Sequence, residues 1–185
     1  MAALPRLLVA DELPLPERMA ARLDGELYAL GDGHCPIDEA ETPDLRLASV
    51  LRGRHPRLIA ELATAAWVWG AATAPPRPEL CVAVGARTRS AGVRGAGVRE
   101  VVLAPHDVSR FAVGAVTTPL RTALDLARAR EPFTTRDAES VRALALVGGF
   151  GLTEATAALD ARRNLPERRR AAERLTAVLA PLRPP

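Results

Sequence analysis

Lysine is absent from this chain, and all 25 of its basic residues are arginine. A Walker A phosphate-binding loop requires a lysine, so the sequence excludes that class of nucleotide-binding protein. A nuclease with a PD-(D/E)xK active site would also lack its lysine. The chain is rich in alanine as well, which is typical of a GC-rich genome, so its arginines alone do not indicate nucleic-acid binding.

Residues that build catalytic or metal sites are scarce. Cys35 and Cys81 are far apart and form no C-x-x-C motif, so we expect free thiols rather than a disulfide framework or a zinc site. His34, His55 and His106 are scattered, without the Glu-x-x-His or cysteine partners of a metal site. No serine lies in a Gly-x-Ser-x-Gly elbow. We therefore predict a protein that is not an enzyme and that holds no cofactor and no metal.

Long apolar runs are also missing, and no segment has the length of a membrane span or the form of a secretory signal. We expect a cytoplasmic protein on that basis. Hydrophobic residues nevertheless make up 48% of the chain, whereas aromatic residues make up 3%. This composition predicts a folded protein whose core consists mainly of alanine, leucine and valine.

Charge is distributed unevenly along the chain. Residues 1–45 contain three arginines and ten acidic residues, whereas residues 46–185 contain 22 arginines and 12 acidic residues. The sequence therefore predicts an acidic N-terminal segment attached to a basic body.

The N-terminal segment has the pattern of a helix followed by a hairpin. Residues 13–25 have a proline in the first turn and end at a glycine, which predicts a short helix. In residues 26–38, two apolar stretches flank Gly31, Asp32 and Gly33, which predicts a β-hairpin. A helix and a hairpin form the second half of a winged helix-turn-helix. We therefore expect residues 1–41 to form a shortened winged-helix-like module.

The remainder, residues 42–185, is expected to form an α+β domain with a small mixed or antiparallel sheet packed against helices. The elements expected there are helices starting at Thr42 and covering 57–71, strands at 79–86, 98–104 and 111–116, and helices at 134–149 and 152–182.

The stretch "VTTPLRTALDLAR", residues 116–128, begins a further helix. Thr118 suits the N-cap and Pro119 the first helical position. Arg121 and Asp125 lie four residues apart, so they face each other on the helix surface. We interpret these four residues as a structural motif at the point where a sheet passes the chain to a helix. The alternative is that Arg121 and Asp125 belong to an active site, although no nucleophile or metal ligand lies nearby in the sequence.

This stretch resembles the Thr-Ser-Pro-x-Arg-Thr-x-x-Asp-Leu-Ala segment of the actinobacterial AbiEi-like antitoxins, an abortive-infection family of type IV toxin–antitoxin systems. The upstream "LATAAWVWGA" looks like that family's Ser-x-x-Ala-Ala-x-Leu-x-Gly helix, and "GELYALGDGHCPID" is similar to its wing strand. The three segments occur in the family's order and span about residues 13–130. The resemblance implies a winged-helix module that binds operator DNA, autoregulation of an operon, and a nucleotidyltransferase-like toxin encoded alongside.

The chain differs from the family in two respects. Its N-terminal module is short, and the acidic residues there repel phosphate where the family would contact DNA. The C-terminal nuclease-like domain of many larger relatives is not expected here.

Two arginine-containing stretches are candidates for nucleic-acid binding. They are a glycine-containing loop with Arg87, Arg89, Arg94 and Arg99, and a C-terminal stretch with Arg162, Arg163, Arg168, Arg169, Arg170 and Arg174. Each stretch is either a solvated surface whose arginine stems cover apolar area, which we favour for the loop, or a patch that follows phosphates. No aromatic residues interleave with them, so stacking on single strands is not expected.

Two functional hypotheses follow. In the first, the chain is a non-enzymatic AbiEi-like antitoxin or transcriptional regulator that contacts duplex DNA through arginine and represses its own operon. In the second, it is a protein-interaction module that keeps the family scaffold, has lost DNA binding, and uses its acidic N-terminal segment to bind a basic partner.

Overall fold

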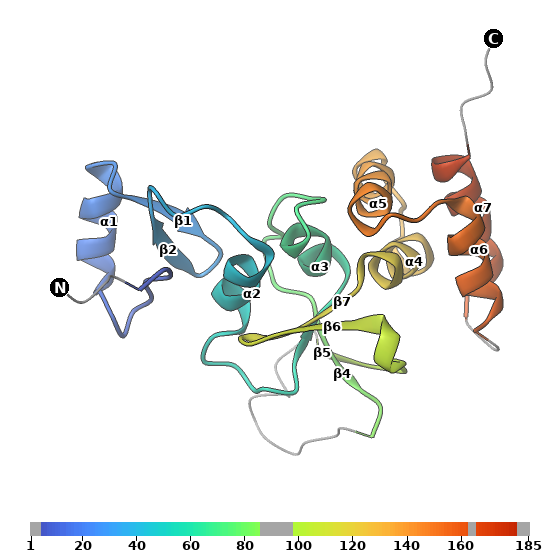
Figure 1. Ribbon diagram of the computed structural model, residues 1–185, viewed down its shortest axis with the longest axis horizontal. Coiled ribbons are helices and arrows are strands. Elements are labelled where there is room, and N and C mark those ends of the chain that lie inside the picture. The colour runs from blue at the N-terminus through green and yellow to red at the C-terminus, as the bar shows by residue number, and fades with distance from the viewer. Residues whose placement is uncertain (1–4, 86–97, 163–165, 181–185) are drawn as a thin grey trace, which may run out of the picture.

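The N-terminal module combines a helix with a β-hairpin, at the blue end of the chain in Figure 1. The computed structural model describes residues 5–85, 98–162 and 166–180. Helix α1 (Leu15–Leu23) is followed by the antiparallel strands β1 (Leu27–Leu30) and β2 (Gly33–Pro36), so the predicted helix and hairpin are confirmed. Gly31 begins the two-residue turn with a φ of 54°, a left-handed conformation that favours glycine.

A five-stranded mixed sheet forms the centre of the fold. Its strands are β3 (Ile59–Ala60), β4 (Leu80–Ala83), β5 (Val98–Val101), β6 (Val108–Phe111) and β7 (Gly114–Thr117). They lie in the order β5-β4-β3-β7-β6, in which β4/β5 and β3/β7 are parallel and the other neighbours antiparallel. Although β3 has only two residues, it is the central strand, and its Ile59 is paired with both Cys81 and Ala115.

Helices cover the sheet and extend away from it. They are α2 (Pro43–Leu51), α3 (Leu62–Val68), α4 (Pro119–Ala129), α5 (Thr135–Gly148), α6 (Leu152–Asp160), α7 (Arg168–Leu179) and the 3₁₀ helix η1 (Pro105–Asp107). In Figure 1, α2, α3 and α4 lie on the same side of the sheet, and α5, α6 and α7 lie beyond them around α4. The α+β class predicted from the sequence is confirmed.

Two main clusters of small and branched aliphatic residues form the core. The first joins the N-terminal hairpin to α2, α3 and the sheet, and includes Leu30, Leu47 and Val116. The second joins α3 and α4 to the C-terminal helices, and includes Leu124 and Leu175. Because the first cluster draws residues from both sides of position 41, the N-terminal module shares its core with the residues that follow it.

The expected helix over residues 57–71 is wrong in its first part. Residues 59 and 60 are β3, and α3 starts only at Leu62. Leu62 has a φ of 50°, which turns the chain sharply between strand and helix. An apolar run does not reveal by its periodicity whether it is a buried strand or a buried helix, and here pairing with two distant strands decides the outcome.

The single strand expected over residues 111–116 is also wrong, because a tight turn divides it. Strands β6 and β7 form an antiparallel hairpin in which Phe111 is opposite Gly114. Gly114 has a φ of 151°, and a Cβ there would lie 2.5 Å from Cδ1 of Leu51. Only glycine fits this position, where the hairpin approaches α2 closely.

Within residues 5–85, 98–162 and 166–180, no single helix is long and apolar enough to cross a membrane. In these residues, only α5 and α6 taken together have that length and composition, and they form a pair bent by 97°.

Candidate functional site

The motif residues lie at the junction between the sheet and α4. Thr118 is the N-cap residue of α4, and its hydroxyl accepts a hydrogen bond from the Arg121 backbone N–H at 3.4 Å, with Pro119 at the start of the helix. The preceding residue, Thr117, accepts a 2.8 Å hydrogen bond from the Trp69 indole through its carbonyl oxygen. The local geometry predicted for this segment is therefore confirmed, and α3 adds a further contact to it.

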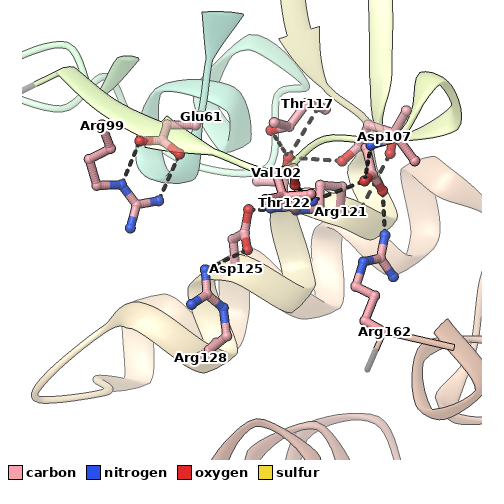
Figure 2. A network of polar contacts seen from close by, with 12 residues as sticks. Glu61, Arg99, Val102, Asp107, Thr117, Arg121, Thr122, Asp125, Arg128 and Arg162 are labelled. Carbon is pink, nitrogen blue, oxygen red and sulfur yellow. Dashed lines mark hydrogen bonds and ion pairs between the residues drawn. The ribbon is translucent and has the colours of Figure 1, made fainter. Parts of the chain in front are cut away.

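Arg121 is buried, with 4% of its surface exposed, and it connects three parts of the fold. Its Nε donates to Oδ2 of Asp125 at 2.7 Å, one turn further along α4 (Figure 2). Its Nη1 donates to Oδ2 of Asp107 in η1 at 2.9 Å and to the carbonyl oxygen of Val102, just after β5, at 3.0 Å. One side chain thus fixes the position of α4 relative to η1 and to the edge of the sheet.

Asp107 is the buried partner that the sequence did not reveal. Its Oδ2 also accepts from the Ala104 backbone N–H at 2.9 Å, and its Oδ1 is bound by Arg162, two residues after α6. Burial alone would raise the pKa of Asp107, but the Ala104 N–H, Arg121 and Arg162 outweigh it and hold this pKa below its ordinary value. Asp107 is therefore a permanently ionised anchor near neutral pH.

Arg128 completes this group of side chains. Its Nη2 donates to Oδ1 of Asp125 at 3.1 Å, so both oxygens of that carboxylate are bound by guanidinium groups. We call Asp107, Arg121, Asp125, Arg128 and Arg162 the Arg121 cluster.

A third buried carboxylate, that of Glu61, forms an ion pair beside this cluster. Glu61, 1% exposed at the N-cap position of α3, accepts from Nε and Nη2 of Arg99 at 2.8 and 2.7 Å (Figure 2). Burial, and then the charge of Glu61, raise the pKa of the Cys81 thiol. Cys81 therefore stays protonated and is unsuited to act as a nucleophile.

The arrangement gives these carboxylates little capacity for acid–base or metal chemistry. Guanidinium groups occupy both oxygens of Asp125 and of Glu61. Among residues 5–85, 98–162 and 166–180, no group of three or more histidine, cysteine or acidic residues is placed to hold a metal ion. What the cluster does is neutralise buried charge and join secondary-structure elements.

The arginines predicted to bind nucleic acid have different environments. Arg162 belongs to the Arg121 cluster, whereas Arg168, Arg169 and Arg170 lie on the surface in the first turn of α7. The surface pairs are Arg168 with Asp160, Arg169 with Glu173, and Arg170 with Glu131 and Glu167. The remaining candidates, Arg87, Arg89, Arg94 and Arg163, lie outside the described residues.

Helix α1 presents an unusual face to solvent. Leu15, Met19 and Leu23, spaced four residues apart, are 57%, 38% and 86% exposed. Arg18 instead points inward, where its Nη1 lies 3.4 Å from Nδ1 of His34. Burial, and then the charge of Arg18, lower the pKa of His34, so its ring is neutral near pH 7. The apolar stripe of α1 is thus turned away from the hairpin.

Comparison with known proteins leaves the family open, because no protein-family model matches the chain and no curated protein is significantly similar to it.

Proposed function

We propose that the chain is a non-enzymatic regulator of the AbiEi-like antitoxin type, which binds duplex DNA at its operator and represses its own operon. A nucleotidyltransferase-like toxin encoded alongside is its functional counterpart. The observation that carries the proposal is the buried pairing of Arg121 with Asp107 and Asp125. This pairing gives the motif an architectural role and leaves exposed arginines of the basic body as the groups available to a partner.

The basic body is the part of the chain suited to DNA. On α1 the exposed stripe is apolar, and Glu17 and Asp24 add negative charge near it. On α7, Arg169 has a side chain that is 94% exposed, and its pair with Glu173 is also open to water. Exposed ion pairs contribute only about 0–1 kcal/mol, so such arginines exchange a carboxylate for a phosphate at little cost.

A salt series tests the DNA proposal. We expect the protein to bind DNA from upstream of its own gene, with an affinity that falls steeply as salt rises. Replacing Arg168, Arg169 and Arg170 together by glutamine removes three candidate phosphate contacts. The slope of log K against log salt should then become shallower by about 2–3, since each contact contributes about 0.9. Gel shifts or fluorescence anisotropy at several salt concentrations measure the slope.

A matched control separates specific contacts from total charge. Replacing Arg6 by glutamine and Arg22 by glutamate removes the same net charge of three from residues 1–45, outside the basic body. This control should keep the slope of the unaltered protein. Absence of any affinity for the upstream DNA at low salt, or equal slopes for the two variants, would contradict the proposal.

The exposed stripe on α1 favours a second candidate function, binding of a basic protein partner by the N-terminal module. Leu15, Met19 and Leu23 offer an apolar contact in an N-terminal segment whose net charge is negative. Apolar area in a polar rim is typical of protein interfaces.

If the N-terminal module binds a basic protein partner, substitutions in the apolar stripe of α1 should remove that binding. Replacing Leu15, Met19 and Leu23 by serine should abolish recovery of that partner from host lysate without unfolding the chain, because the three side chains are exposed. Serine at Leu146 and Val147, which are exposed on α5, is the control and should recover the partner normally. Equal recovery of the partner by the unaltered protein, the stripe variant and the control would exclude α1 as its binding surface.

A further inference from the structure

A cleft of about 610 Å³ opens beside the Arg121 cluster. Residues of β5, η1 and α4 line it, together with Arg162 and its neighbours after α6. Its lining arginines are Arg99, Arg121, Arg128 and Arg162, and its lining acids are Glu100 and Asp107. The cleft therefore contains more guanidinium groups than carboxylates, which is the charge balance of an anion site.

Two of the carboxylates that pair with these arginines lie behind the cleft wall, whereas Asp107, which pairs with Arg121 and Arg162, is part of it. Glu61 and Asp125 are 1% and 2% exposed and are not part of the cleft wall. In Figure 2, Glu61 holds Arg99 through two nitrogens, and the third nitrogen points away from that carboxylate. Glu61 and Asp125 thus hold the guanidinium groups of Arg99 and Arg128 in place from outside the cleft wall, which reduces the entropy lost when an anion binds.

Arg128 also lines the cleft and keeps an unused hydrogen-bond donor. Its Nε is buried and has no hydrogen-bond partner, while its Nη2 is held by Asp125. A buried donor without an acceptor is unfavourable. A small rotation of this guanidinium toward an anion in the cleft would give the donor an acceptor.

The rest of the wall suits a ligand with an apolar part. Val101, Val102, Ala104, Ala161 and Pro166 also line the cleft and contribute apolar surface to it. The volume falls within the range of about 300–1,000 Å³ that is usual for small-molecule and cofactor sites. An inorganic ion alone would leave most of this space unused.

We propose that this cleft binds a phosphate monoester of nucleotide size, with the phosphate on the arginines and the apolar part against the remaining wall. The inference goes beyond the DNA-binding proposal and does not depend on it, because it is tested with mononucleotide in the absence of DNA.

Calorimetric titration of the full chain tests the ligand class. Adenosine 5′-monophosphate should bind, and inorganic phosphate should bind at least about tenfold more weakly, which corresponds to about 1.4 kcal/mol. Adenosine, which lacks the phosphate, should give no measurable binding. Equal affinities for the nucleotide and for inorganic phosphate would overturn the assignment to a ligand of nucleotide size, and binding of adenosine as tight as that of its monophosphate would overturn the role of the arginines.

Two matched variants test the location. Val102 lines the cleft and is 77% exposed, so Val102→Glu adds a carboxylate there without disturbing the core. It should raise the dissociation constant for the monophosphate at least about tenfold. Leu146→Glu makes the same charge change at an 85% exposed position on α5 outside the cleft, and should leave the constant unchanged. Failure of the unaltered protein to bind the monophosphate, or equal effects of the two substitutions, would overturn the proposal.

Discussion

Replacing Arg121 by methionine should lower the free energy of unfolding by about 3–5 kcal/mol, the usual loss when one partner of a buried ion pair is removed. Asp107 and Asp125, which are 3% and 2% exposed, would lose this partner without gaining water. The loss should lie toward the lower end, because Arg162 still binds Asp107 and Arg128 still binds Asp125.

Urea denaturation followed by tryptophan fluorescence measures this loss. Trp69, which is hydrogen-bonded to Thr117 beside the cluster, reports on the same junction. Arg169→Met is the matched control, since that arginine is 94% exposed and its removal should change stability by about 0.5 kcal/mol or less. Similar losses for the two variants would show that burial of the Arg121 cluster contributes nothing special to stability.

The second large effect is expected at Arg99, although its side chain is 39% exposed. Its partner Glu61 is 1% exposed, so Arg99→Met leaves a buried carboxylate without its partner. This change should lower the free energy of unfolding by about 3–5 kcal/mol at pH 8. The reverse change, Glu61→Gln, leaves an arginine that can turn toward water, and should cost only about 1 kcal/mol.

The contrast between the two single variants distinguishes an unpaired buried charge from lost packing. Arg99→Met and Glu61→Gln disrupt the same ion pair, but only Arg99→Met leaves a buried carboxylate without its partner. Urea denaturation of both variants measures the difference, and an equal or larger loss for Glu61→Gln would contradict the account.

The features that could be predicted from the sequence are those that depend on residues close together in the chain. A cap residue, a proline and an Arg/Asp pair four residues apart are sufficient to place the start of α4, and Gly31 places the turn of the N-terminal hairpin. Their geometry follows from helix and turn stereochemistry alone.

The rest of the site depends on contacts between distant residues. Asp107 lies 14 positions before Arg121, and Arg162 lies 55 positions after Asp107. Glu61 and Arg99 are 38 positions apart. No local pattern indicates such pairs, because they form only when η1, α6 and the sheet edge are brought to α4. The same dependence on distant pairing explains why β3 was expected to be helical.

The most direct test of the account is a double-mutant cycle on Arg121 and Asp125, using Arg121→Met, Asp125→Leu and the double variant in urea denaturation. If the pair is an architectural joint, the double variant should lose less stability than the two single variants lose together. The difference, the coupling energy, should be about 1–3 kcal/mol. Unchanged DNA affinity of the folded double variant is the accompanying expectation. Losses that add within about 0.5 kcal/mol would contradict the account.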